Sequence, residues 1–173
     1  YVKSVSTTPN SKITYDEYTT HLLNDLQEAE DLFEDNDPIC TYSIERLNSP
    51  SFMEDSYWGY RQMRMNYYAV CATKARLYLW LGNKTDALKY AKIVMNAKDN
   101  TDNKMYRLGN SDDCAKKDYT LSCEHILNIY VKDLATTPLG SAKGYEKTKS
   151  LLTSQLYGSG STDIRLNMMW DYV

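Results

Sequence analysis

Aromatic residues are concentrated in the run SFMEDSYWGY at positions 51–60, with two carboxylates among them. A ring can stack on the apolar face of a pyranose while neighbouring polar groups bond its hydroxyls. Tyr57, Trp58 and Tyr60 are therefore candidate ligand-binding residues for a carbohydrate, with Phe52 close by. The alternative is that the same rings cover the end of a pair of helices as part of the core.

The sequence offers no set of catalytic residues. It contains no nucleophile elbow, phosphate loop, dinucleotide fingerprint or zinc-protease helix. Its two histidines, His21 and His125, are expected to be structural or exposed. A glycosidase needs two carboxylates across a cleft, one of them partly desolvated. The acidic candidates instead lie on an expected water-facing helix side (Glu28, Glu30 and Asp31) or in an expected loop (Asp112 and Asp113). We expect a protein that is not an enzyme and has no catalytic residues and no cofactor.

The four cysteines, Cys40, Cys71, Cys114 and Cys123, are spaced too widely and irregularly for a zinc site. No metal site is expected. Cys71 falls in an apolar stripe, where a small buried filler is the favoured interpretation over a reactive thiol. Cys114 and Cys123 would be able to form a bridge in an oxidising compartment, and the sequence leaves that open.

Composition indicates an ordinary globular protein. The chain has 173 residues, 42% of them hydrophobic and 25% charged, which is enough for one sizeable core. Its net charge is -3 and no Lys/Arg cluster interleaves with aromatics, so a nucleic-acid surface is not expected. The first residue is a tyrosine and the last segment, LNMMWDYV, is apolar. We therefore expect residues 1–173 to be a single partial domain of a longer protein.

A helix is predicted over residues 14–34. Thr14 and Glu17 have the spacing of a capping box, and Ile13 with Tyr18 can form the flanking staple. The following stripe at helical spacing consists of Tyr18, Leu22, Leu26, Ala29 and Phe33, while the acidic residues are expected to face water.

A helix hairpin is predicted over residues 63–97. Its first stripe consists of Tyr67, Tyr68, Cys71, Ala72, Ala75, Tyr78 and Leu79, and its second of Ala87, Leu88, Ala91, Val94 and Met95. Gly82 can take the left-handed conformation that ends a helix, and Asn83 can cap the next one. We expect the 14–34 helix to lie against this hairpin.

The other segments carry weaker signals. Residues 35–59 predict a long surface loop with room for one short helical turn. Residues 98–173 are loop-rich, with a short strand predicted at MYRLG, a polar loop at NSDDCAKKDYT, a buried strand or short helix at SCEHILNIYV, and loops over most of 135–162. The expected fold is mainly α: tetratricopeptide-like antiparallel helix hairpins with long loops and minor β structure.

The spacing of Ala75, Tyr78, Gly82, Ala87 and Ala91 resembles one tetratricopeptide repeat. The order of segments, from ITYDEYTTHLLNDLQEAEDLF through RMNYYAVCATKARLYLWLGNKTDALKYAKIVMNA and SCEHILNIYV to LLTSQLYGSGSTDIRLNMMW, resembles the central part of the SusD/RagB family of Bacteroidetes outer-membrane lipoproteins. One of these segments departs from the family pattern and another matches it. Cys123 separates Ser122 from Glu124, which are usually adjacent, and Asp163 with Arg165 match the Asp-x-Arg element.

This resemblance implies a lipid-anchored protein at the cell surface that captures oligosaccharide or another nutrient for a TonB-dependent transporter of the SusC type, as part of polysaccharide utilization. No ligand residue of the family can be transferred to a position of this chain. The alternative is a protein–protein interaction adaptor whose hairpin binds a partner's carboxylates through Lys74 and Arg76.

Overall fold

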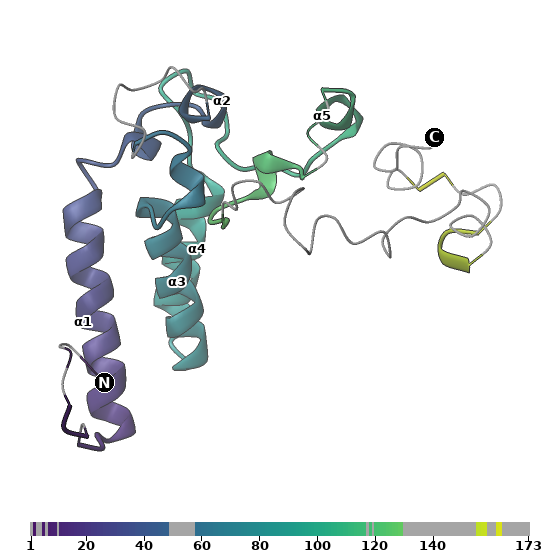
Figure 1. The fold of residues 1–173 in the computed structure, drawn as a ribbon. Helices are drawn as coiled ribbons and strands as arrows, with labels where there is room; N and C mark the ends of the chain where they lie inside the picture. Colours follow the sequence, from purple (N-terminus) through teal and green to yellow (C-terminus); the bar gives the residue numbers. More distant parts are fainter. Residues whose placement is uncertain are drawn as a thin grey trace. The chain divides into compact units, whose positions relative to one another are not determined.

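The computed structural model describes residues 2, 5, 7–9, 11–48, 58–116, 118, 120–129, 155–158, 162 and 163, and it is mainly helical, as predicted (Figure 1). The elements are α1 (Tyr15–Phe33), η1 (Pro38–Cys40), α2 (Ile44–Leu47), η2 (Arg61–Met63), α3 (Tyr67–Trp80), α4 (Lys84–Met95), α5 (Ser111–Ala115) and η3 (Ser122–Glu124), where η marks a 3-10 helix. The chain divides into two compact units, residues 1–106 and 107–173. The loops expected over 135–162 lie mostly outside the described residues.

Helix α1 begins where the capping box predicts. The Glu17 amide donates to the Thr14 hydroxyl at 3.3 Å, and the Thr14 amide donates back to the Glu17 carboxylate at 2.8 Å. Two otherwise unpaired backbone donors are thereby satisfied. The apolar stripe of α1 is only partly covered: Leu22, Leu26, Ala29 and Phe33 are half-buried and Tyr18 is exposed. The residues of α1 that are fully buried are Thr19 and Glu30, both of them polar.

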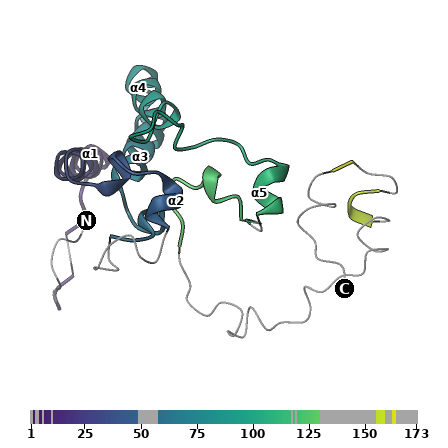
Figure 2. The ribbon, with the colours of Figure 1, turned by 90° about the horizontal axis from the view of Figure 1, so that it is seen from above.

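Helices α3 and α4 pack as an antiparallel pair, and α1 packs against α3 (Figures 1 and 2). Asn66 caps α3 by accepting from the Ala69 amide at 2.9 Å. Gly82 ends the turn after α3 with a φ of +79°, and Asn83 accepts from the Asp86 amide at 3.1 Å to start α4. The predicted roles of Gly82 at the end of the first helix and of Asn83 as the cap of the second are confirmed.

A pair of tyrosines joins the two helices. Tyr78 of α3 and Tyr90 of α4 stack with ring centroids 5.7 Å apart. Within α3, the rings of Tyr67 and Tyr68 meet edge-on at 5.3 Å. The predicted apolar stripes are wrong at three positions. Leu79, Leu88 and Met95 are exposed by 62%, 56% and 68%. These side chains do not lie on the side of their helix that packs against the other helices.

The expectation of a long surface loop over residues 35–59 is wrong for its described part. This segment forms η1 and α2, and Ile39, Ile44 and Leu47 are buried. The helical turn at η1 begins at Asp37, whose carboxylate accepts from the Ile39 amide at 3.1 Å. Local capping and three buried apolar side chains therefore fold the segment onto the unit.

The second unit contains α5 and η3. Asn110 and Asp113 form a capping box for α5, so the polar loop expected there is in part helical. Asp113 is buried rather than loop-exposed, and it forms two hydrogen bonds to the Arg107 guanidinium at 2.6 and 2.7 Å.

No strand forms at MYRLG. The extended pairing in the described part of the chain is a single isolated bridge between Lys98 and Lys104. In the described part of SCEHILNIYV, residues 122–129, the expected buried strand or short helix is wrong: η3 is followed by residues in neither helix nor strand, and Leu127 and Ile129 are 48% and 83% exposed. Tyr130 and Val131 lie outside the described residues.

Candidate functional site

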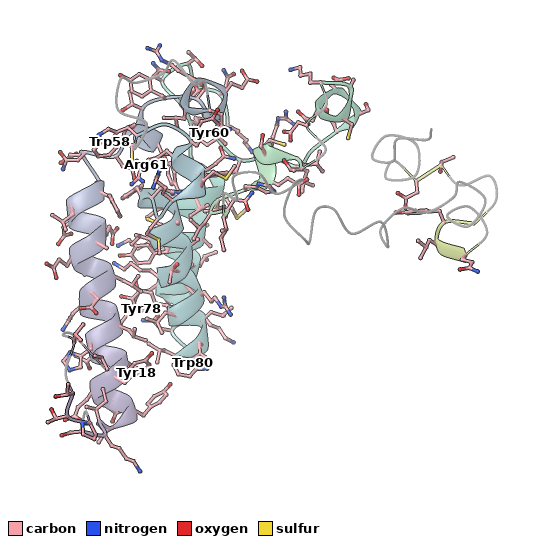
Figure 3. The ribbon with its side chains drawn as sticks, viewed as in Figure 1. Tyr18, Trp58, Tyr60, Arg61, Tyr78 and Trp80 are labelled. Carbon is pink, nitrogen blue, oxygen red and sulfur yellow. The ribbon has the colours of Figure 1, made fainter. Side chains whose placement is uncertain are left out.

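The predicted ligand-binding aromatics lie at the entrance to η2, near the end of α1 and the start of α3 (Figure 3). Trp58 is half-buried and Tyr60 is 39% exposed. Tyr57 and Phe52 lie outside the described residues. The structure thus brings two of the three candidates into one short segment of the first unit.

Trp58 contacts a buried arginine. The guanidinium carbon of Arg61 lies 5.6 Å from the centroid of the Trp58 ring and 5.3 Å from that of Phe33, at the end of α1. Arg61 itself is only 1% exposed. Because a cation over an aromatic face is attracted to its π electrons, Arg61 joins the Trp58 segment to α1. Trp58 therefore packs against Arg61.

A single carboxylate, that of Asp37, organises this region. It receives Arg61 in a bidentate pair, with Nε at 2.8 Å and Nη2 at 2.9 Å. The same carboxylate accepts from the amide of Tyr67, the first residue of α3, at 3.0 Å. Its side chain is completely buried. A buried charge is tolerated when it is paired and all its lone pairs are engaged, which is the case for Asp37.

The backbone at Tyr60 has an unusual conformation. Its φ and ψ are +52° and +45°, in the left-handed region that few non-glycine residues enter. Its amide donates to the Leu47 carbonyl at 2.7 Å, which ties the residue to α2. Residues held in this region are enriched at binding and catalytic sites, where the surrounding structure imposes the conformation.

A second polar cluster lies between the helices. Lys74 of α3, 1% exposed, pairs with Glu30 of α1, donates to the Gln27 side chain at 2.7 Å and lies 4.3 Å from the centroid of the Tyr90 ring. The Tyr90 hydroxyl of α4 also donates to Glu30, at 3.1 Å. The expectations that Glu30 faces water and that Lys74 is available to a partner's carboxylate are therefore wrong. Each of the two charges is neutralised by the other inside the helix packing.

Protonation in this cluster follows its geometry. Burial acts to lower the pKa of the Lys74 ammonium, but hydrogen bonds with Glu30 and Tyr90 outweigh it, and the pKa lies above its ordinary value. Burial raises the pKa of the Tyr90 hydroxyl, with the adjacent Glu30 charge adding to the effect. The lysine therefore stays charged and the tyrosine neutral at physiological pH.

All four cysteines are free thiols. Cys71 is completely buried, as predicted, and burial raises its pKa to about 11. Cys114 is buried and Cys123 half-buried, so the bridge left open by the sequence is not formed. In the part of the chain that the structure describes, no three His, Cys, Asp or Glu side chains are placed to hold a metal ion, and no helix is long and apolar enough to cross a membrane.

The chain was compared with protein-family models, curated proteins and solved structures. None of them matches.

Sequence reasoning missed Asp37, Arg61, Glu30 and Lys74 as paired groups. The pairs join residues 24 and 44 positions apart, so no local spacing reveals them. One signal was present: Asp37 precedes Pro38, and an acidic residue before a proline is a frequent start of a helical turn.

Proposed function

We propose that this chain is the central helical portion of a nutrient-binding protein of the SusD/RagB type. Such a protein captures oligosaccharide at the outer membrane's outer surface, where a lipid anchors it, and passes the ligand to a SusC-type TonB-dependent transporter without chemical conversion. The supporting observation is the arrangement of the first unit. A capped helix, α1, packs against the antiparallel pair α3 and α4, in the segment order that the resemblance implies.

The candidate ligand contact is the segment containing Trp58 and Tyr60. Tyr60 keeps 39% of its surface accessible although its backbone is held in a strained conformation, and Trp58 is fixed beside it through Arg61. Fixed rings lose little conformational freedom when a sugar stacks on them. Asp37 and Arg61 bind each other, so in this proposal they position the rings and do not contact the sugar.

Tyr60 offers the cleaner mutational test, because removing the Trp58 ring would also expose the buried Arg61. Tyr60→Asn removes the ring while keeping a residue that tolerates positive φ. Tyr60→Phe keeps the ring and removes only the hydroxyl. The matched control is Trp80→Ala, since Trp80 is 61% exposed and ends α3, about 20 Å along the helix from Tyr67 at a rise of 1.5 Å per residue (Figure 3).

The experiment is a glycan-array screen of the full chain followed by calorimetric titration of any ligand found. We expect saturable binding that Tyr60→Asn weakens at least tenfold and that Tyr60→Phe and Trp80→Ala largely retain. Binding to no glycan would reject the carbohydrate function. Binding that survives Tyr60→Asn but not Trp80→Ala would keep the function and reject the site.

The adaptor alternative has less support. Of the two cations expected to hold a partner's carboxylates, Lys74 is occupied by Glu30, and Arg76 is the one that remains exposed.

A further inference from the structure

Helix α4 presents a basic and apolar outer face. Lys84, Leu88, Lys92 and Met95 repeat at intervals of four, four and three residues, so they lie on one side of the helix. All four are exposed, with Leu88 at 56% and Met95 at 68%. Neither lysine has an ion-pair partner among the described residues. We refer to these four residues as the α4 strip.

Helix α1 presents the opposite charge. Glu28, Asp31 and Leu32 are exposed on its outer side, with Leu32 at 64%, and α1 contains no lysine or arginine at all. Asp31 accepts a hydrogen bond from Gln27 within the same helix, at 2.8 Å. We refer to Glu28, Asp31 and Leu32 as the α1 strip.

Both strips lie outside the helix packing. Helix α3 packs against both α1 and α4 (Figure 2), and the residues of the two strips remain exposed. Among the described residues, no ion pair joins one strip to the other within one molecule. A second copy of the chain, however, can bring its α1 strip to the α4 strip of the first.

We propose that the chain associates with itself head to tail, with the α1 strip of one copy packed on the α4 strip of the next. The two strips are complementary in charge. The α1 strip has two carboxylates and a leucine, and the α4 strip has two ammonium groups and two apolar side chains. The apolar side chains supply the attraction, while the charges select the partner face and its orientation. Because the two strips differ, the contact is heterologous and leaves a free strip at each end of the assembly.

The test is sedimentation equilibrium of the full chain at concentrations up to about 1 mM, because a contact made by one helix face is at the weak end of protein interfaces. We expect the average mass to rise steadily with concentration and to pass that of a dimer. Raising the salt from 0.15 M to 1 M should weaken the association, since exposed charges are then screened beyond about 3 Å.

Two variants each block one strip. Lys84→Glu/Lys92→Glu reverses the α4 strip, and Glu28→Lys/Asp31→Lys reverses the α1 strip. Each alone should associate at least tenfold more weakly. Mixed together, the two variants should associate again as alternating copies, because their intact strips pair with each other and their two reversed strips also carry opposite charges. Lys104→Glu/Lys116→Glu, which makes the same change in net charge as Lys84→Glu/Lys92→Glu at exposed positions outside both strips, is the matched control for that variant.

Circular dichroism of each variant checks that the helices remain folded, and Lys84→Gln/Lys92→Gln with Glu28→Gln/Asp31→Asn replace any reversal variant that unfolds. A wild-type chain that stays monomeric at every concentration would overturn the proposal. So would blocked variants that associate as strongly as the control, or a mixture of the two that does not associate.

Discussion

Replacing Lys74 with methionine should destabilise the first unit severely. Methionine nearly matches the length of the lysine stem, so the change removes the charge with little loss of volume. The Glu30 carboxylate, in a residue only 8% exposed, would lose its cationic partner and keep the Tyr90 hydroxyl. Removing one partner of a buried ion pair typically costs about 3–5 kcal/mol. That is a large share of the roughly 5–15 kcal/mol by which proteins of this size are stable.

The double variant Lys74→Met/Glu30→Met should recover much of that loss. It removes both charges, and apolar replacements of a buried pair are often neutral or stabilising. The Tyr90 hydroxyl would then lack its acceptor, which costs about 1–3 kcal/mol. We therefore expect the double variant to be more stable than Lys74→Met by about 2 kcal/mol, although it carries one more substitution.

The assay is urea unfolding followed by circular dichroism at 222 nm, because α1, α3 and α4 carry most of the described helix. Free energies of unfolding are compared for the wild type, Lys74→Met and the double variant. The reasoning would be refuted by a loss below about 1 kcal/mol in Lys74→Met, or by a double variant no more stable than the single one.

Three further predictions concern single residues. Gly82→Ala should cost about 1 kcal/mol in urea unfolding, since no atom lies within 4 Å of the added Cβ and the penalty comes from the φ of +79° alone; a cost near zero would contradict it. The hydrogen bonds from Arg107 and the Asn110 amide hold the pKa of the Asp113 carboxyl well below its unfolded value of about 3.9. This lowered pKa stabilises α5 above about pH 4, and the contribution is lost as the pH falls further. The chemical shifts of the α5 amides should therefore change only under strongly acidic conditions, and Asp113→Asn should abolish that titration. The Cys71 thiol, with its pKa raised to about 11 by burial, should not react with a disulfide reagent at pH 8 until urea unfolds the chain; rapid reaction of the folded protein would show that the residue is accessible.

The parts of the fold that the sequence predicts are those governed by local rules. Thr14 and Glu17 cap α1 from adjacent turns, and Gly82 with Asn83 forms the break between α3 and α4, so neighbouring residues contain the necessary information. The α5 capping box was also readable, in Asn110 and Asp113, but a helix of five residues leaves no periodic pattern to support it.

The parts that it does not predict depend on distant partners. Periodicity assigns Glu30 and Lys74 to water because they are charged, whereas a charge can be buried once an opposite one lies within hydrogen-bonding distance on another helix. The position of Trp58 likewise depends on Arg61, which is held by Asp37 from a segment that composition classifies as loop. The sequence therefore suggests which segment contains the candidate site, but it does not predict that Asp37 and Arg61, which hold that segment, are buried.

The four hydrogen bonds that the Asp37 carboxylate accepts affect how the first unit opens. The carboxylate simultaneously binds the amides of Ile39 and Tyr67 and, through two bonds, the guanidinium of Arg61. No one of these groups can be exposed to water with the carboxylate still in place and fully satisfied, so η1, η2 and the first turn of α3 should open in one cooperative step. Native-state hydrogen exchange should then give the amides of Ile39 and Tyr67 the same opening free energy, although one lies in a short 3-10 turn and the other begins a long helix.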